Sequence, residues 1–386
     1  MRRSQHGFPN RRRVLSGATS LLASTAAGPV FGHRALAAAA ERSKAEDGAT
    51  SLGTLAIAKG IDLGASFAVH ELDQPYGQAY AAAYLRDART LTSELSFKMS
   101  TLRPAADTLD FAPADRLVEF ATRNRLKLRA HTLIWNDALP QWIHRLGPDE
   151  VRLLFEAHIM TMVERYRGRV WAWDVVNEPI GPWDRLPGNL RKGPFLTAFG
   201  ESYIARAFRA ARALDGSAIL VLNEAQTESD DENGKVFRDS LLALLKRLKA
   251  DAVPIDAVGL QSHLFSDKPY DFAKFVGFLD EIASLGFAIH ITELDVNDRA
   301  FAADIRQRDA AVADLYRRFL TAVLPHPAVK ALTFWQLADH TSWLWYEATS
   351  GAKLRREPRP LLLDKSFHRK PAWFAVASAL KAMPPR

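Results

Sequence analysis

Cysteine is absent from all 386 residues of this chain. Its absence excludes disulfide bonds, thiolate catalysis and metal sites built from cysteine ligands. A chain without cross-links must draw its stability from a large apolar core, and apolar residues make up 48% of this sequence. After the N-terminal region, no uninterrupted apolar run reaches the roughly 18 residues of a transmembrane helix, so we expect no membrane partner for the mature protein.

Acidic residues are absent from residues 1–37, which contain six arginines. These arginines supply most of the formal net charge of +7, because the rest of the chain carries only +7 − 6 = +1. A nearly neutral protein has no electrostatic surface for a polyanion. The composition therefore argues against nucleic acid as a partner and suits a neutral substrate.

The order of features in residues 1–37 is typical of an export signal. Residues 10–16, Asn-Arg-Arg-Arg-Val-Leu-Ser, resemble a twin-arginine motif, a weakly apolar run follows, and Ala35-Leu36-Ala37 offers a cleavage site. We predict a cleavable signal peptide over 1–37, read by the twin-arginine export machinery of a bacterium, and a flexible link over 38–52. The mature protein is then periplasmic or secreted. A disordered basic tail is the alternative.

Short apolar runs and longer amphipathic stretches alternate from residue 53 to the C-terminus. Eight strand–helix repeats in one domain predict a closed (β/α)8 TIM barrel over 53–386, and the lack of an early Gly-x-Gly-x-x-Gly turn weakens the open-sheet alternative. We expect strands near 60–66, 94–99, 126–131, 170–177, 218–223, 255–261, 287–293 and 329–335, and helices near 77–90, 113–124, 148–166, 197–214, 233–250, 271–285, 302–323 and 371–382.

Polar and aromatic side chains gather where seven of the expected strands end, and such ends face the active site of a barrel. Buried charges at a barrel mouth are costly unless they are paired or used, so their coincidence indicates a site. The candidates are Glu94, Lys98, His131, Trp135, Asp174, Asn177, Glu178, Asn223, Glu224, Gln261, His263, Glu293, Asp295, Trp335, Asp339 and Trp343.

Two of these candidates, Glu178 and Glu293, stand on strands that oppose each other across an eight-stranded barrel. Cleavage of an acetal needs an acid on the leaving oxygen and a carboxylate near the anomeric carbon, and retaining glycosidases hold the two carboxyls about 5–5.5 Å apart. Asn177 is placed to bind a sugar 2-hydroxyl, and the tryptophans offer flat apolar faces for sugar rings. A structural ion pair of either glutamate with Lys98 or Arg129 is the alternative.

Five motifs, in order, resemble glycoside hydrolase family 10, the endo-1,4-β-xylanases. They are Arg129-Ala-His-Thr-Leu-Ile-Trp135, Trp173-Asp-Val-Val-Asn-Glu-Pro179, Val258-Gly-Leu-Gln-Ser-His263, Ile291-Thr-Glu-Leu-Asp295, and Phe334-Trp335 with Asp339 and Ser342-Trp343. The resemblance runs from about residue 60 to the C-terminus. It implies a retaining mechanism without cofactor or metal.

By position in these motifs, the resemblance implies that Glu178 is the acid/base and Glu293 the nucleophile. It also implies that Asn177, His263 and Asp295 support the pair. The residues that it implies to line the sugar subsites are Glu94, Lys98, His131, Trp135, Gln261, Trp335 and Trp343.

Two positions depart from the family pattern. Leu95 stands where the family usually has asparagine after the strand-two glutamate, and Asn136 stands where it usually has histidine after the tryptophan. If Leu95 faces the groove, we expect weaker binding of unbranched xylan or tolerance of another sugar. The chemistry is unaffected by either change.

The sequence thus predicts an exported, monomeric endo-β-1,4-xylanase acting on xylan or xylo-oligosaccharides. Two alternatives stay open: the same mechanism on another β-glycoside, such as an aryl xyloside or a decorated oligosaccharide, and a barrel that only binds carbohydrate. Both glutamates being present argues against the second alternative.

Overall fold

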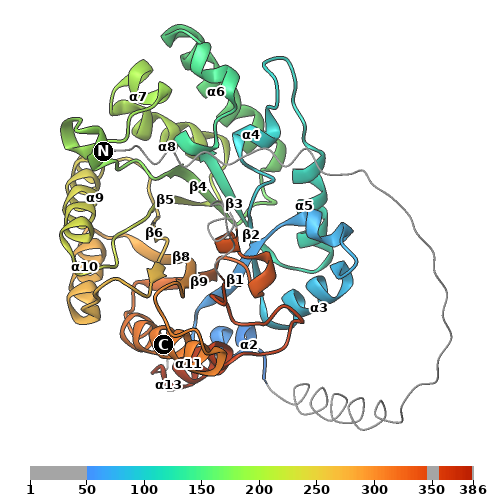
Figure 1. Ribbon diagram of the computed structural model, residues 1–386. Coiled ribbons are helices and arrows are strands. Elements are labelled where there is room, and N and C mark those ends of the chain that lie inside the picture. The colour runs from blue at the N-terminus through green and yellow to red at the C-terminus, as the bar shows by residue number, and fades with distance from the viewer. Residues whose placement is uncertain (1–49, 346–355, 385–386) are drawn as a thin grey trace, which may run out of the picture. The chain divides into compact units, whose positions relative to one another are not determined.

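The computed structural model describes residues 50–345 and 356–384 (Figure 1). The predicted signal peptide and residues 38–49 of the predicted link lie outside this part of the chain. Helix α2 (Leu52–Ile57) begins directly after Ser51, whose hydroxyl accepts a hydrogen bond from the backbone N–H of Thr54. A serine at this N-cap satisfies one of the free helix donors, which fixes the start of α2 at Leu52.

Eight parallel strands close into a barrel, which confirms the predicted TIM fold (Figure 1). Neighbouring strands pair in chain order, β6 pairs with β8, and β1 pairs with β9 to close the ring. A ninth strand, β7, pairs with β8 alone. The strands are β1 (Asp62–Phe67), β2 (Thr90–Ser93), β3 (Lys127–Ile134), β4 (Ala172–Asn177), β5 (Ile219–Glu224), β6 (Ala257–Leu260), β7 (His263–Phe265), β8 (Ala288–Asn297) and β9 (Val329–Phe334).

Helices surround the barrel, and each of its strands is followed by one long helix (Figure 1). These helices are α3 (Gly77–Asp87), α5 (Ala112–Arg123), α6 (Pro148–Tyr166), α8 (Ser202–Leu214), α9 (Glu232–Ala250), α10 (Phe272–Ser284), α11 (Ile305–Val323) and α13 (Pro371–Ala382). Two short helices, α4 (Met99–Leu102) and α7 (Pro194–Phe199), lie in the connections after β2 and β4.

Two of the predicted elements were wrong in position or extent. The strand expected at 94–99 is β2 at Thr90–Ser93, because Leu91 and the small polar residues around it pair with β3, so Glu94 and Lys98 lie in the loop that follows. The helix expected at 197–214 is two helices, α7 and α8. Gly200 ends α7 with φ of 63°, a left-handed conformation that glycine adopts without strain.

Helix α6 shows how the chain encodes an element boundary. Pro148 occupies its first turn, where a missing N–H costs nothing, and Glu150 reaches back to accept a hydrogen bond from the backbone N–H of Gly147 at 2.8 Å. Acidic residues in this turn also suit the positive end of the helix dipole. The predicted helix 148–166 is confirmed.

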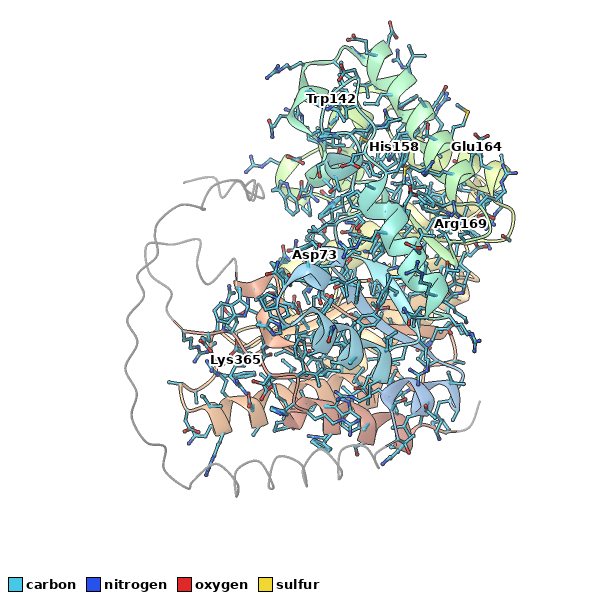
Figure 2. All side chains as sticks on the ribbon, turned by 90° about the vertical axis from the view of Figure 1, so that its right-hand side faces the viewer. Asp73, Trp142, His158, Glu164, Arg169 and Lys365 are labelled. Carbon is cyan, nitrogen blue, oxygen red and sulfur yellow. The ribbon has the colours of Figure 1, made fainter. Side chains whose placement is uncertain are left out.

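Most of the apolar core lies between the strands and the surrounding helices, whereas the inside of the barrel is largely polar. At the N-terminal end, Ala172, Val221 and Ala257 form a small separate apolar cluster. The side view shows Trp142 and His158 in the β3–α6 region, far from Lys365 near the C-terminal segment (Figure 2). Trp142 is partly buried, packs against the apolar core and donates to the Arg103 carbonyl at 3.0 Å. None of the helices in the described part is long and apolar enough to span a membrane.

Candidate active site

Glu293 lies on β8 and is 4% exposed. Its Oε1 accepts a hydrogen bond from the Asn223 side-chain amide at 2.8 Å, and its Oε2 lies 3.4 Å from Nε2 of His263. Burial alone raises the pKa of a carboxyl, but the hydrogen bond from His263 and the positive charges nearby outweigh burial and lower the pKa of Glu293 to about 2. Glu293 is therefore a buried anion at neutral pH.

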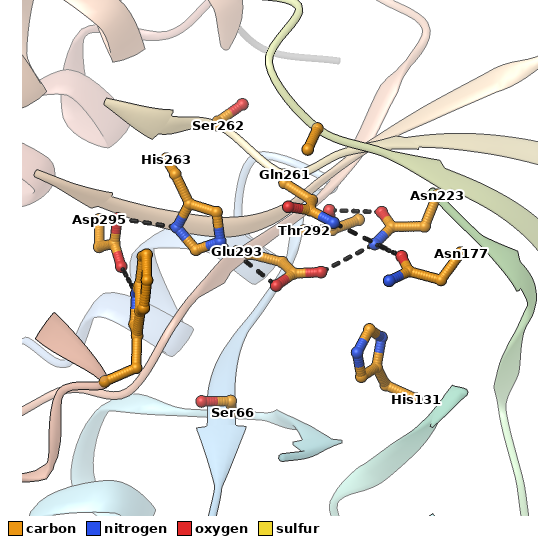
Figure 3. Close-up of polar contacts among 12 residues, drawn as sticks. Ser66, His131, Asn177, Asn223, Gln261, Ser262, His263, Thr292, Glu293 and Asp295 are labelled. Atoms are coloured by element: carbon orange, nitrogen blue, oxygen red, sulfur yellow. Dashed lines mark hydrogen bonds and ion pairs between the residues drawn. The ribbon is translucent and has the colours of Figure 1, made fainter. Parts of the chain in front are cut away.

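His263 lies between two carboxylates (Figure 3). Its Nδ1 is 2.8 Å from Oδ1 of Asp295, while Nε2 faces Glu293. Burial lowers the pKa of His263, yet the charges and hydrogen bonds of the two carboxylates reverse this effect and raise the pKa well above its usual range. Trp343 donates its indole N–H to the other oxygen of Asp295 at 2.7 Å. The imidazolium thus bridges Glu293 to a fixed partner.

Strand register explains this contact. The chain turns after strand β6, where Ser262 has φ of 61°. The next strand, β7, pairs with β8, and in this pairing His263 lies opposite Asp295. The N–H and hydroxyl of Ser262 donate to the buried carboxyl of Glu228 at 2.9 and 3.2 Å. A non-glycine residue in the left-handed region costs free energy, and the two hydrogen bonds to Glu228 help to hold Ser262 there.

Three amide side chains, Asn223, Asn177 and Gln261, lie beside Glu293 (Figure 3) and connect it to Glu178. Asn223 donates to Oδ1 of Asn177 at 2.8 Å as well as to Glu293. Gln261 donates to Oε1 of Glu178 at 2.9 Å and lies 3.5 Å from the same Asn177 oxygen. Nδ2 of Asn177 is buried and has no hydrogen-bond partner in the described structure, so a donor at this point is available to a ligand.

Glu178 follows β4 in a strained backbone conformation. Its φ is 51°, and its N–H donates to the Asn223 carbonyl at 2.9 Å. Oε2 of its carboxyl accepts the indole N–H of Trp135 at 3.1 Å and forms an ion pair with Arg191. The side chain is 17% exposed, more than the 5% of the Glu293 side chain.

A polar layer inside the barrel holds His131. Nδ1 of this ring lies 2.7 Å from Asp174, which also accepts from Nε of Arg129 at 3.0 Å. Nε2 is buried and has no hydrogen-bond partner in the described structure. Trp335 packs edge-on against the ring with centroids 5.3 Å apart. His131 therefore presents one nitrogen to the site and fixes the other on Asp174.

The loop after β2 contributes a cation and a carboxylate. Nζ of Lys98 lies 4.8 Å from the ring centre of Trp135. Ser66 contacts the carboxyl of Glu94 at 3.4 Å, and Gln336 also donates to it. Burial lowers the pKa of Lys98 and raises the pKa of Glu94, and in each case the neighbouring charge opposes the shift.

The two departures from the family pattern differ in environment. Leu95 is 38% exposed, directly after Glu94, so it is not part of the core. Asn136 begins a 3-10 helix and packs on the backbone of Gly193, where an added Cβ would lie 2.0 Å from its Oδ1. Asn136 therefore contacts the loop after β4.

The structure brings the predicted site residues to the C-terminal ends of the strands. Glu224, left open by the sequence, is buried under the turn after β4, where it accepts from the backbone N–H of Ile180 at 3.0 Å. Sequence reasoning missed Arg191 and Gln336. Arg191 lies thirteen residues beyond Glu178 in the chain, in a loop that no strand pattern predicts, and Gln336 follows the strand-eight tryptophan without a motif of its own.

The chemistry available here is that of carboxylates, amides, one imidazolium, the cations of Lys98 and Arg191, and aromatic faces. Within residues 50–345 and 356–384, no cluster of three or more His, Cys, Asp or Glu side chains could hold a metal ion. A closed parallel barrel with two carboxylates joined by amides at its mouth defines a barrel hydrolase of the glycosidase type.

Comparison with known proteins makes the assignment specific: the chain belongs to glycosyl hydrolase family 10, whose profile matches residues 51–379. It is 30% identical to endo-1,4-beta-xylanase B of Thermotoga neapolitana over 80% of this chain and 85% of that protein. It is 34% identical to a thermostable celloxylanase of Thermoclostridium stercorarium over 77% and 80%. The family resemblance seen in the motifs is confirmed.

Solved structures agree in fold. Native xylanase 10B from Thermotoga maritima superimposes with a TM-score of 0.77 at 30% identity, covering 86% of this chain and 98% of that one. Xylanase 10B from Thermotoga petrophila RKU-1, solved in complex with xylobiose, gives the same TM-score at 29% identity and the same coverage.

Proposed function

We propose that this protein is a retaining endo-β-1,4-xylanase that cleaves internal β-1,4-xylosidic bonds of xylan or xylo-oligosaccharides. Glu293 acts as nucleophile, and Glu178 acts as general acid and then general base. The observation that carries this assignment is the contrast between the two carboxyls. Glu293 is a buried anion held by Asn223 and His263, whereas Glu178 is more exposed at the groove. The xylanase relatives and the xylobiose-bound structure support the substrate class.

In the first step, an oxygen of Glu293 forms a bond to the anomeric carbon. The bond from that carbon to the glycosidic oxygen breaks, and the leaving oxygen takes the proton of Glu178. The hydrogen bonds from His263 and Asn223 fix the attacking carboxylate, so little reorganisation is needed. The product is a xylosyl ester of Glu293.

In the second step, Glu178 removes a proton from water while the water oxygen attacks the anomeric carbon. The ester bond breaks, Glu293 recovers its negative charge, and the configuration is retained. The same residue thus gives and takes one proton per turnover. Gln261 and Trp135 hold its carboxyl at both oxygens during this exchange.

The site offers buried polar nitrogens and aromatic rings for contacts with the sugar. Nδ2 of Asn177 and Nε2 of His131, both buried and unpartnered in the described structure, are suited to hydroxyls of the sugar at the cleavage point. Glu94 and Lys98 can bind the next sugar toward the non-reducing end. Trp135, Trp335 and Trp343 supply aromatic walls, and Asp295 orients His263.

The test distinguishes the acid/base from the nucleophile by comparing substrates whose leaving groups differ in their need for protonation. Residues 38–386 are assayed on unbranched xylan, xylo-oligosaccharides and an aryl xyloside whose phenolate leaves without protonation. We expect Glu178→Ala to lose roughly 10²–10⁴-fold in kcat/KM on xylan and far less on the aryl xyloside. Glu293→Ala should lose activity on all three substrates.

The other outcomes decide between the alternatives. Activity on the aryl xyloside alone keeps the mechanism and moves the natural substrate to another β-glycoside. Binding of xylo-oligosaccharides without any turnover favours a barrel that only binds carbohydrate. Release of α-configured product from a β-linked substrate contradicts the retaining mechanism.

We also propose that residues 1–37 direct export through the twin-arginine route, on the strength of the arginine run at residues 11–13, the apolar run and the cleavage site. Replacing Arg11, Arg12 and Arg13 by lysine should leave the precursor in the cytoplasm of a bacterial host. Unchanged export of this variant would exclude the route.

A further inference from the structure

Arg191 forms ion pairs with two carboxylates, one proposed to be catalytic and one on a neighbouring loop. Its Nη1 pairs with Glu178, and its Nη2 pairs with Asp137 on the loop after β3. The Arg191 side chain is 13% exposed, and the ring of Trp183 covers it at 5.4 Å from the ring centre. Burial disfavours its charge, yet the two carboxylates outweigh burial and raise its pKa. The guanidinium is therefore a permanent cation at this point.

The backbone holds Arg191 in place. Its N–H donates to the carbonyl of Pro179 at 2.7 Å, and the adjacent residues Leu190 and Ile180 form an antiparallel bridge. This short hairpin starts from the residue after Glu178, so the cation and the carboxyl share one rigid segment. Asp137 approaches from a different loop and can be changed without altering this hairpin.

A cation on Glu178 conflicts with its proposed first task. A nearby positive charge favours the ionised carboxyl, whereas a general acid must keep its proton until the glycosidic bond breaks. Asp137 offers the guanidinium a second anion and so weakens its pull on Glu178. The other charged groups that act on this carboxyl or on Arg191 are Lys98 and Glu224, and Lys98 in turn interacts with Glu94 and Glu293.

We propose that Arg191 and Asp137 are a positioning pair for the two proton transfers of Glu178, an inference that rests on the proposed role of Glu178. When Glu178 is neutral, the ion pair with Asp137 balances the charge of the guanidinium. When Glu178 has given its proton to the leaving oxygen, the guanidinium stabilises the new carboxylate. Taking a proton from water in the second step returns the pair to its first state, so one proton enters and one leaves per cycle.

The proposal predicts opposite effects on the pH profile of kcat/KM for a xylo-oligosaccharide. Arg191→Met removes the cation, Glu178 keeps its proton to higher pH, and the basic limb moves up by roughly one pH unit. Asp137→Asn removes the second anion, so Glu178 is the only one of the two carboxylates that still pairs with Arg191. The basic limb of the profile then moves to lower pH. The double variant Asp137→Asn/Arg191→Met should lie close to Arg191→Met, because the proposed effect of Asp137 on Glu178 passes through the guanidinium.

Controls separate this from a packing effect. Arg116→Met breaks an exposed ion pair with Asp73, 43% and 61% exposed, and should leave the profile unchanged. Arg191→Lys keeps the charge and should keep most of the wild-type limb, which also covers the case in which the methionine variant folds poorly. Equal shifts of one sign in Asp137→Asn and Arg191→Met, or no shift in either, overturn the proposal.

Failure of the proposed function looks different. If Glu178→Gln retains the wild-type basic limb on the same oligosaccharide, that limb does not report Glu178, and the acid/base assignment itself is wrong. If Glu178→Gln abolishes the limb while Asp137→Asn and Arg191→Met leave it in place, the acid/base assignment stands and the positioning pair is excluded.

Discussion

The side-chain amide of Asn223 on β5 lies 2.8 Å from Oε1 of Glu293 on β8, although β6 stands between the two strands. The intervening residue is Gly259, and a Cβ at this position would lie 2.2 Å from Oδ1 of Asn223. The contact between the amide and the carboxylate therefore depends on a residue without a side chain on the strand between them.

Gly259→Ala should displace Asn223 and reduce kcat/KM on xylo-oligosaccharides. The added methyl meets Asn223 at 2.2 Å and Thr292 at 2.9 Å, so one of these side chains must move. Steady-state kinetics checks the loss, for which we expect at least roughly tenfold from one displaced hydrogen bond to a charged group. Gly277→Ala is the matched control, because nothing lies within 4 Å of its added Cβ and the helix α10 should tolerate or gain from alanine. Equal activity in the two variants would contradict this role of Gly259.

Glu293→Gln should change how stability depends on pH. The folded pKa of Glu293 is lowered to about 2 from an ordinary value of 4.5, so its charge contributes stability above pH 4.5 that is lost as the pH falls toward 2. The wild type should therefore exceed the variant by more at pH 6 than at pH 3.5, and the gap should differ between the two pH values by about 1 kcal/mol. Urea unfolding at the two pH values measures the difference. A gap that does not change with pH contradicts the lowered pKa.

Lys370→Met should destabilise the fold strongly. Lys370 is 3% exposed and donates to Asp339 at 2.9 Å, a carboxyl whose pKa burial raises to about 6. Breaking a buried pair by removing one partner costs about 3–5 kcal/mol, because the other charge stays buried. Lys127→Met is the control, since its ion pair with Asp62 is 50% and 29% exposed and should contribute less than about 1 kcal/mol. Equal unfolding midpoints for the two variants would count against the buried pair.

Leu95→Asn should lower KM for unbranched xylo-oligosaccharides and leave kcat nearly unchanged. Leu95 is exposed beside Glu94 and stands where the resemblance in the motifs implies an asparagine, so the change adds a donor at the edge of the site. Leu109→Asn, at another exposed leucine that is 44% exposed, controls for general surface effects. A raised KM in Leu95→Asn alone indicates that leucine itself contacts the substrate of this protein.

The fold could be predicted because each repeat carries its own periodicity, and helix boundaries at Pro148 and Pro371 are local signals. The error at residues 94–99 arose from the alternation of Leu95, Phe97 and Met99 with polar residues, although the buried Phe97 lies in a loop and not in a strand. Burial is shared by strands and packed loops, so hydrophobicity could not separate them. The break between α7 and α8 at Gly200 likewise could not be predicted, because it depends on the positive φ of this glycine.

The candidate site divides in the same way. Side chains at strand ends, such as Glu178 and Glu293, follow from the barrel and its motifs. Arg191 and Gln336 could not be predicted, because both lie in loops. A loop has no hydrophobic periodicity from which the direction of a side chain could be inferred. The roles of all these residues stay predictions until the variants are measured.

The pairing of β1 with β9, in which Asp62 stands opposite Ala331, has a consequence for how the protein is made. The first strand has no partner on one edge until nearly the whole chain has left the ribosome. Until then that edge is open to other chains, and long-range parallel pairing is slow. Closure of the ring is thus a late event after synthesis, and an export route that carries only finished, folded cargo would act as a checkpoint on that closure.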